Sequence, residues 1–512
     1  MSTSRQGMVV TSQPLAVDAG LELLEDGGSA VDAAVAAAAV LTVVDPRSTG
    51  LGGDLFALCW QAGDRAPTGL ASAGVAPARL TMDALREAGH TTMPVDGPWS
   101  VTVPGAPAGW EALLERFGRA GRERVLAPAI RHAEHGFAVS RYVAEEWVSA
   151  EAKLRSHPAA AALFLPGGKV PVEGKRFVIP ELAGSLERFA REGAAPFYGG
   201  DIAQRLAAAV EEAGGVLRAS DFAEWAGPEW VASISAPYRS LTVHEMPPPG
   251  QGIVVLEALR IVERLQPSGS VQEEHALIES LKAAFADAAD TVADPAVERV
   301  PVDELLGDAN IAARRERISM REPAESDVGR PSDTVYVAVV DGEGNGCSLI
   351  QSVYDGFGSG IAAPGTGIIV QNRASGFLMA DGHPNRPAPR KRPLHTILPA
   401  MLERDGRFAG CLGVVGGYMQ PQGQVQILRN LLDRGMAPQA ALDAPRFRVY
   451  KRRRIALEAD YPRPLAEGLG ALGHELEGLP RRESGGAQLI LATPDGLVGA
   501  SDSRKDGYVG RR

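Results

Sequence analysis

A threonine stands where a polar connection in this chain meets an apolar run. Thr334 follows Asp333 and precedes residues 335–340, which read VYVAVV. If the chain breaks just before Thr334, that residue gains a free amine beside its own hydroxyl. A threonine hydroxyl is a weak nucleophile at its ordinary pKa, and an N-terminal amine on the same residue can act as its base. The sequence therefore predicts a nucleophile that self-cleavage would create.

The elements around this threonine follow from composition and alternation. Residues 312–333 are polar and charged and carry two prolines, which is typical of an exposed connection in which cleavage is accessible. Residues 334–340 and 346–352 flank the segment DGEGN, a pattern that predicts a strand, a turn and a strand. Further short apolar runs predict a sheet-rich C-terminal third, and they cover residues 367–371, 398–402, 408–415 and 488–492.

The N-terminal part shows helical periodicity and clear helix signals. Residues 14–25 predict a helix, and Ser29 with Asp32 forms a capping-box start for a second helix that ends before Pro46. The glycine-rich segment 48–54 then leads into an apolar strand. That segment is either a ligand cradle or a tight turn, and it lacks the Lys-Ser/Thr end of a phosphate-binding P-loop.

The middle of the chain is predicted to be mostly helical. Helical patterns cover much of residues 107–217 and recur at 254–265 and 275–290, whereas 241–245 reads as a strand. We interpret His275 as a capping or surface histidine rather than a metal ligand, because no second histidine stands one helical turn later.

Composition excludes several classes of protein. The 512 residues are 45% hydrophobic and 22% charged, which predicts one compact globular unit with a large core. A net charge of -11 disfavours a nucleic-acid partner. Three scattered cysteines give neither a disulfide framework nor a zinc motif. The start lacks a signal-peptide pattern and the Ala-rich run 30–44 is too short to span a membrane, so we expect a cytoplasmic protein without membrane contact.

The chain resembles the gamma-glutamyltranspeptidase family of N-terminal nucleophile hydrolases over nearly its whole length. The motifs that carry the resemblance are 7–12 (GMVVTS), 27–34 (GGSAVDAA), 49–53 (TGLGG), 103–105 (VPG), 197–200 (FYGG), 391–394 (KRPL) and 416–417 (GG). The resemblance implies an α+β fold, a four-layer αββα sandwich. It also implies a proenzyme that cuts itself into a large subunit, residues 1–333, and a small subunit, residues 334–512, within one intertwined structural unit.

The resemblance assigns roles to single residues. Thr334 matches the family nucleophile because it stands seven positions before Asp341. Ser352 matches a second hydroxyl that hydrogen-bonds the nucleophile. Gly416 and Gly417 match the glycine pair whose backbone N–H groups line the oxyanion site. The alternatives are an ordinary strand threonine, a polar strand end and a plain turn.

Departures from the family pattern bear on the acyl group. Residues 70–77 (LASAGVAP) lack the arginine that precedes an Ala-Pro pair in glutamyl transferases. Tyr354, Arg373 and Gly376 replace the asparagine, glutamine and aspartate that recognise the amino and carboxyl groups of the substrate. Without a carboxylate at Gly376, a free α-amino group would lose water without compensation. A glutamyl donor should therefore bind poorly.

Other residues at these positions favour an acidic acyl group. His395 and Thr396 replace the paired serines of the family, and with Arg373 and Tyr354 they form the predicted substrate-binding set. A guanidinium can bind a carboxylate through a pair of hydrogen bonds. The alternative is an arginine paired with a structural acid and a histidine satisfied in the core. We expect a small acidic acyl group without an amine, as in the branch that includes oxamate amidohydrolases.

The predicted chemistry has two stages. The Thr334 hydroxyl attacks the Asp333 carbonyl and water resolves the ester; the same oxygen then attacks an amide substrate to form an acyl-enzyme. No metal or organic cofactor is implied. Two alternatives stay open, a genuine gamma-glutamyltransferase or glutathione hydrolase and a non-catalytic family member that acts as a binding protein. The sequence also leaves open whether the acyl group passes to water or to an amine, and whether two processed heterodimers form a dimer.

Overall fold

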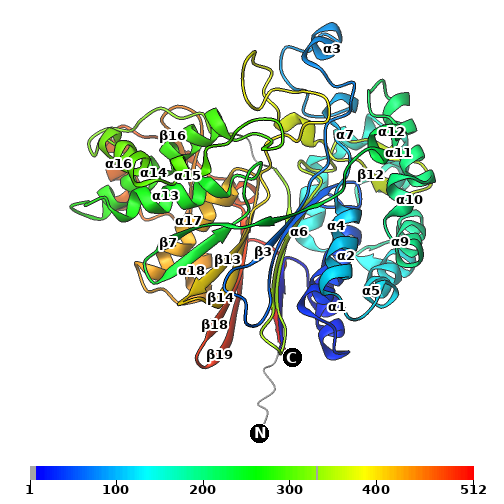
Figure 1. Ribbon diagram of the computed structural model, residues 1–512, viewed down its shortest axis with the longest axis horizontal. Helices are drawn as coiled ribbons and strands as arrows, with labels where there is room; N and C mark the ends of the chain where they lie inside the picture. The colour runs from blue at the N-terminus through cyan, green and yellow to red at the C-terminus, as the bar shows by residue number, and fades with distance from the viewer. Residues whose placement is uncertain (1–6, 330–331, 512) are drawn as a thin grey trace.

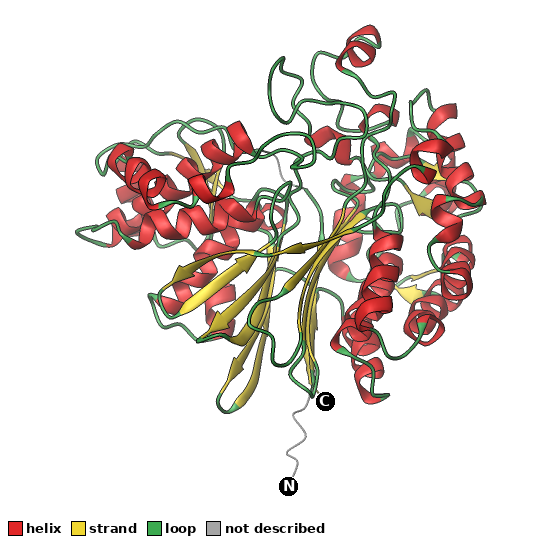
Figure 2. Ribbon diagram, in the orientation of Figure 1, coloured by secondary structure: helices red, strands yellow, loops and turns green. Residues whose placement is uncertain are grey.

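The computed structural model describes residues 7–329 and 332–511, in which two β-sheets face each other between two layers of helices. Figure 1 and Figure 2 show the sheets in the centre, with one helical layer beyond each sheet. This arrangement is the expected four-layer αββα sandwich of the α+β class.

The first sheet has seven antiparallel strands that interleave distant parts of the chain. Its order is β20 (Tyr508–Arg511), β1 (Met8–Thr11), β9 (Val335–Val340), β10 (Gly346–Ser352), β2 (Asp54–Trp60), β3 (Thr68–Ser72) and β6 (Glu229–Ala232). The β9–β10 hairpin predicted from sequence is confirmed. It lies in the middle of the sheet, between strands that come from the N-terminal third of the chain.

The second sheet is also antiparallel and has six strands. Its order is β19 (Gly496–Ser501), β18 (Gly486–Thr493), β14 (Arg407–Val415), β13 (Pro399–Arg404), β8 (Leu241–Glu245) and β7 (Ile234–Tyr238). The expected sheet-rich C-terminal third is therefore confirmed.

Side-chain alternation along β9 explains how one sheet serves two cores. Val335, Val337 and Val339 belong to the core under the first helical layer. Tyr336 and Ala338 belong to the core between the two sheets. Because successive side chains of a strand point to opposite faces, a strand buried on both sides reads as a continuous apolar run.

The first helical layer covers the seven-stranded sheet. Its longer helices are α1 (Pro14–Glu25), α2 (Ala30–Val44), α4 (Ala106–Phe117), α5 (Arg122–His135), α9 (Pro180–Glu192) and α11 (Asp201–Glu212). Every residue of α2 is buried, because this helix contacts the sheet at β9 and β10 and also packs against α1 and α5. Its predicted capping box is confirmed: Ser29 Oγ accepts from Asp32 N at 3.1 Å, and Ser29 N donates to Asp32 Oδ2 at 2.8 Å.

The second helical layer covers the six-stranded sheet. Its members are α13 (Gly252–Glu263), α14 (Ser270–Thr291), α16 (Asp308–Arg317), α17 (Met419–Leu432), α18 (Pro438–Asp443) and α19 (Arg463–Ala471). The remaining elements are α3 (Met82–Glu87), η1 (Pro98–Ser100), β4 (Phe137–Ala138), α6 (Arg141–Ser149), α7 (Glu151–Arg155), α8 (Pro158–Phe164), η2 (Pro166–Gly168), β5 (Arg176–Phe177), α10 (Ala195–Tyr198), α12 (Ala219–Ala223), α15 (Val302–Leu305), β11 (Ala362–Ala363), β12 (Ile368–Ile369), η3 (Arg373–Gly376), β15 (Phe447–Val449), β16 (Arg454–Leu457), β17 (Glu475–Gly478) and η4 (Arg481–Glu483).

The expectation for residues 312–333 was partly wrong. Helix α16 continues to Arg317, and the later part of the segment is not uniformly exposed: Val328 and Ser332 are buried, as is Thr334 just beyond it. These residues pack against the second helical layer and the sheet ends instead of looping into solvent. A cut beside Thr334 would thus occur inside the protein, where groups of the same chain surround the bond.

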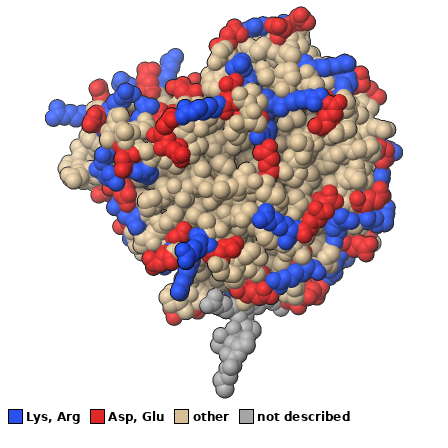
Figure 3. Space-filling model, viewed as in Figure 1, with Lys and Arg blue, Asp and Glu red and all other residues tan. Residues whose placement is uncertain are grey.

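Two observations concern the surface and the helices. On the face seen in Figure 3, positive and negative side chains are interspersed around a broad uncharged area. Within residues 7–329 and 332–511, no helix combines the length and the apolar character that a membrane crossing needs.

The sheet-to-sheet contact yields a stability prediction. A Cβ at Gly413 on β14 would lie 2.3 Å from the ring of Tyr336 on β9. Gly413→Ala should lower the free energy of unfolding by about 1–3 kcal/mol, because the fully buried ring has to shift. Chemical denaturation would measure the change. Gly184→Ala in α9 is the matched control, since its Cβ would meet nothing within 4 Å, and equal stability of both variants would contradict the prediction.

Candidate active site

Three polar side chains converge on the intact peptide bond between Asp333 and Thr334. Thr334 Oγ1 donates to the Asp333 carbonyl oxygen at 2.6 Å. Ser352 Oγ donates to the same oxygen, also at 2.6 Å. Gln420 Nε2 donates to Thr334 Oγ1 at 3.2 Å. The carbonyl of this bond is therefore polarised by two hydroxyls, one of which belongs to the next residue.

The β9–β10 hairpin brings the two hydroxyls together. Val335 pairs with Gln351, so the register places Thr334 and Ser352 opposite each other at the open end of the hairpin. Thr334 stands two positions before Tyr336, so its side chain points to the same face of the sheet, and the side chain of Ser352 opposite it does the same. Tyr336 belongs to the core between the sheets. The two hydroxyls therefore lie at the end of the inter-sheet core, within reach of groups from both sheets.

The turn of this hairpin gives a physical reason for the spacing between Thr334 and Asp341. Asp341 Oδ1 accepts from the backbone N–H of Glu343 at 3.0 Å and of Asn345 at 2.9 Å, while Oδ2 accepts from Asn345 Nδ2 at 2.8 Å. The N–H of Ala30 also donates to Asp341 Oδ2, at 3.1 Å. Asp341 thus closes the turn and ties it to the start of α2, which fixes the hairpin register.

Ser352 is oriented by the backbone that follows it. Tyr354 N donates to Ser352 Oγ at 2.8 Å, so the serine proton is directed to the Asp333 carbonyl oxygen. Asp333 N donates to Tyr354 O at 2.7 Å. Tyr354 has a φ of 80°, an unfavourable left-handed conformation for a residue with a Cβ. This strained residue holds the segment before Thr334 in place.

Arg47 is a site residue that the sequence reasoning missed. Its Nη1 lies 2.6 Å from Asp333 Oδ1, and its Nη2 lies 3.1 Å from Glu146 Oε2 on α6. Burial alone would lower the pKa of Arg47, but the carboxylates of Asp333 and Glu146 raise it above its ordinary value. The available signal was its position directly after Pro46, where a helix gives way to the glycine-rich segment.

The predicted glycine pair lies beside the same segment, at the start of α17. Gly416 and Gly417 have φ values of 118° and 62°, which favour glycine. A Cβ at Gly417 would lie 2.5 Å from Ser332 Oγ, so a side chain there would displace the segment next to Thr334. The turn that the pair forms also starts the helix that carries Gln420, another group missed from sequence. An oxyanion role for the two glycines stays a prediction.

The four predicted substrate-binding residues lie together around a buried acid. Arg373 stacks on Tyr354, with its Cζ 4.3 Å from the ring centroid, and its Nη1 donates to Thr396 Oγ1 at 3.2 Å. Its Nε lies 3.9 Å from Asp54 Oδ2, and His395 Nε2 lies 2.9 Å from the same oxygen. In this structure Arg373 and His395 therefore face a structural acid, and their role toward a substrate stays a prediction.

Asp54 accepts hydrogen bonds from several separate segments of this region, which its place in the sequence did not indicate. Its Oδ1 accepts from Gly74 N at 3.1 Å, Gly105 N at 3.0 Å and Gln371 Nε2 at 2.9 Å. Its Oδ2 faces His395. Asp54 is fully buried at the start of β2. The Asp54 carboxylate thus connects the segments that carry Gly74, Gly105 and Gln371 with His395.

Comparison with protein families and curated proteins gives a consistent result. Residues 16–511 match the family model described as gamma-glutamyltranspeptidase. The chain is 38% identical to the glutathione hydrolase-like YwrD proenzyme of Bacillus subtilis, over 98% of this chain and 97% of that protein. It is 34% identical to the oxamate amidohydrolase proenzyme of Klebsiella pneumoniae, over 99% of this chain and 98% of that protein.

The fold of the chain is also similar to that of a solved structure. The crystal structure of cephalosporin acylase from Bacillus halodurans matches with a TM-score of 0.94 and 39% sequence identity. The match covers 99% of this chain and 96% of that chain.

The Asp54 contacts predict a stability effect. Asp54→Asn should lower the free energy of unfolding by about 3 kcal/mol, because the fully buried Arg373 loses its facing negative charge. Urea titration would measure the loss. Asp381→Asn is the matched control, since its partner Arg86 is exposed and such pairs contribute less than about 1 kcal/mol. Indistinguishable midpoints for the two variants would contradict the organising role of Asp54.

Proposed function

This chain belongs to the gamma-glutamyltranspeptidase family of N-terminal nucleophile hydrolases, whose members are amidohydrolases and acyltransferases, and from that premise we propose a specific site and substrate class. Thr334 is the nucleophile, and the chain matures by cutting itself between Asp333 and Thr334. The mature enzyme cleaves an amide of a small dicarboxylic acid through an acyl-enzyme.

The main support for this proposal is that the hydroxyls of Thr334 and Ser352 both donate to the Asp333 carbonyl oxygen. Thr334 Oγ1 attacks the carbonyl carbon, and the Ser352 hydroxyl donates to the oxygen as it becomes negative. The C–N bond then breaks, and the threonine nitrogen takes the proton from Oγ1. Water hydrolyses the resulting ester, which leaves Asp333 with a new carboxylate and Thr334 with a free amine and hydroxyl.

Turnover uses the same oxygen with the new amine as its base. The Thr334 amine removes the proton from Oγ1, which attacks the substrate carbonyl, and the N–H groups of Gly416 and Gly417 bind the oxyanion. Proton transfer from the amine to the leaving nitrogen releases the first product. Water then hydrolyses the acyl-enzyme, or an amine takes the acyl group in a transfer reaction.

The two pieces of the cut chain would stay together without a covalent link. Strands β9 and β10 belong to residues 334–512 and pair with strands of residues 1–333: Val337–Val340 of β9 pair with β1, and the whole of β10 pairs with β2. Separating the large and small subunits would break both ladders and expose two cores. The processed form is therefore a single intertwined heterodimer.

Arg47 supports the choice of an acidic acyl group. In maturation the acyl group is that of Asp333, and its side-chain carboxylate is paired with Arg47. In turnover the substrate acyl group becomes attached to the same Oγ1, so its carboxylate can reach the same guanidinium. In Asp333 the carboxylate is separated from the reacting carbonyl by Cα and Cβ. A succinyl-type acyl group reproduces this separation, whereas in oxamate the two groups are joined directly.

The proposed maturation can be tested by electrophoresis. Wild-type protein should give two fragments in denaturing electrophoresis, with Thr334 as the N-terminal residue of the smaller one by mass spectrometry. Thr334→Ala should remain a single chain, because it lacks the attacking oxygen. Thr334→Ser keeps that oxygen and is the matched control, which should still be cut. An intact wild-type chain that hydrolyses amides would rule out the mechanism.

The proposed acyl group can be tested by kinetics on processed enzyme, with rates normalised for the fraction of the protein that is cut. Succinamate should exceed neutral butyramide in kcat/KM by roughly 10–100-fold, because a charge-assisted hydrogen bond contributes about 1.5–3 kcal/mol. Arg47→Gln should remove most of this preference. Oxamate and a chromogenic γ-glutamyl anilide are the comparison substrates.

Arg373→Gln is the comparison variant for Arg47, since it removes the other cation near Tyr354. Loss of the anionic preference in Arg373→Gln alone would assign the carboxylate to Arg373 instead. Rapid release from the γ-glutamyl anilide would favour a genuine gamma-glutamyltransferase. A processed protein with no activity on any of these amides would favour the binding-protein alternative.

A further inference from the structure

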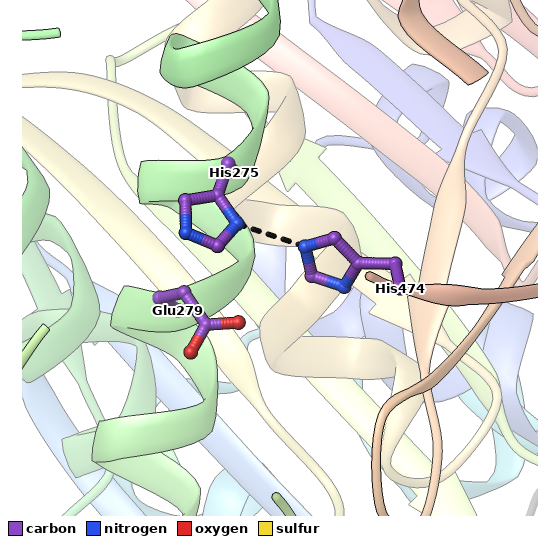
Figure 4. Close-up of side chains that lie close together, drawn as sticks. All are labelled: His275, Glu279 and His474. Atoms are coloured by element: carbon purple, nitrogen blue, oxygen red, sulfur yellow. Dashed lines mark hydrogen bonds between the residues drawn. The ribbon is translucent and has the colours of Figure 1, made fainter. Parts of the chain in front are cut away.

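Three buried side chains with metal-ligand chemistry meet in the second helical layer, outside the site described above. His275 and Glu279 lie one turn apart on α14, and His474 follows α19 (Figure 4). One ligand atom from each lies within 4.8 Å of the other two. All three residues are buried. The expectation that His275 is a capping or surface histidine was therefore wrong, because its partner comes from a distant part of the chain.

Hydrogen bonding determines which nitrogen of His275 faces this cluster. His275 Nε2 lies 2.8 Å from Ser319 O, and a carbonyl oxygen can only accept. The proton is therefore on Nε2, and the lone pair is on Nδ1, which lies 2.8 Å from His474 Nε2. Metal-binding histidines usually have this arrangement, with the second ring nitrogen held by a carbonyl or carboxylate.

One buried acceptor of the cluster has no donor. His474 Nδ1 is buried, and it has no hydrogen-bond donor within residues 7–329 and 332–511. Glu279 Oε1 lies 2.8 Å from Lys282 Nζ in a buried ion pair, and the same ammonium also donates to Ala324 O. A buried acceptor without a donor is costly, and the imidazole and carboxylate groups that meet here are the ligand types that a divalent cation binds.

We propose that His275 Nδ1, His474 Nε2 and Glu279 Oε1 bind a divalent transition metal of the zinc type. Imidazole nitrogens with a carboxylate oxygen are a recurrent zinc ligand set, which leaves one position of a tetrahedron for water. When the metal binds, it replaces the hydrogen bond between the histidines, and the proton on His474 Nε2 moves to Nδ1. The ammonium of Lys282 competes for Glu279, so the affinity should be lower than that of a closed four-ligand site.

The position of this metal site suggests a structural role. His275 and Glu279 belong to residues 1–333, whereas His474 belongs to residues 334–512. The same face of α14 also holds the connection toward Asp333, because Glu279 Oε2 accepts from Ala324 N at 2.9 Å and His275 contacts Ser319 O. A bound metal would therefore link the two pieces of a cut chain. This role depends on the proposed cleavage, but metal binding itself does not.

The test uses full-length protein without a histidine tag. Protein stripped with EDTA is equilibrated with ZnCl₂, desalted and measured by elemental mass spectrometry, and about one zinc per chain is expected. His474→Gln and Glu279→Gln should each lose most of this zinc. His132→Gln on α5 is the matched control, because this histidine is outside the cluster and only partly buried. Zinc should also raise the melting temperature of wild type and not that of His474→Gln.

The outcomes separate this proposal from the proposed function. The uncut Thr334→Ala chain should bind zinc as wild type does, and visible absorption by bound Co²⁺ should report tetrahedral ligands in both. Wild type that retains no zinc after desalting would overturn the proposal. So would a folded His474→Gln or Glu279→Gln variant that retains as much zinc as His132→Gln.

Discussion

The register of one hairpin determines the chemistry that this fold can support. Asp341 closes the turn between β9 and β10, and the pairing of Val335 with Gln351 then places Ser352 opposite Thr334. A shift of one residue would turn every side chain of the hairpin to the other face of the sheet. The two hydroxyls would then point into the helical layer, and the Asp333 carbonyl would lose the serine that donates to it.

Burial of the bond at Asp333 explains why the surrounding groups come from so many elements. A carbonyl in the interior is polarised strongly by nearby donors, because little water competes with them. Ser352 comes from the same hairpin, Gln420 from the helix that covers the other sheet, and Arg47 from the loop after α2. The site therefore exists only when both sheets are packed together, so the proposed self-cleavage would depend on completed folding.

The sequence predicted what depends on neighbours in the chain and missed what depends on long-range contacts. The helix α1, the capping box of α2 and the hairpin follow from local periodicity and turn residues, and Thr334 was found from the hairpin and the family motifs. Arg47 and Gln420 were missed because an isolated arginine or glutamine carries no local signal for a partner far along the chain. His275 was misread for the same reason, since His474 stands 199 positions later.

The proposed cut changes the electrostatics around Arg47 in a way that would open the site. Before the cut, Arg47 is shared between Glu146 and the side chain of Asp333, which is held at both ends by the peptide chain. Hydrolysis would add a second carboxylate to Asp333 and remove its covalent link to Thr334, which leaves the chain before it and the hydrogen bond from its N–H to Tyr354 O as restraints. That chain is held further upstream, where α14 binds Ser319 and Ala324. Asp333, at the end of the large subunit, can then move away from Arg47 while Ser319 and Ala324 stay bound to α14. A free acidic amide would compete with Asp333 for the Arg47 guanidinium.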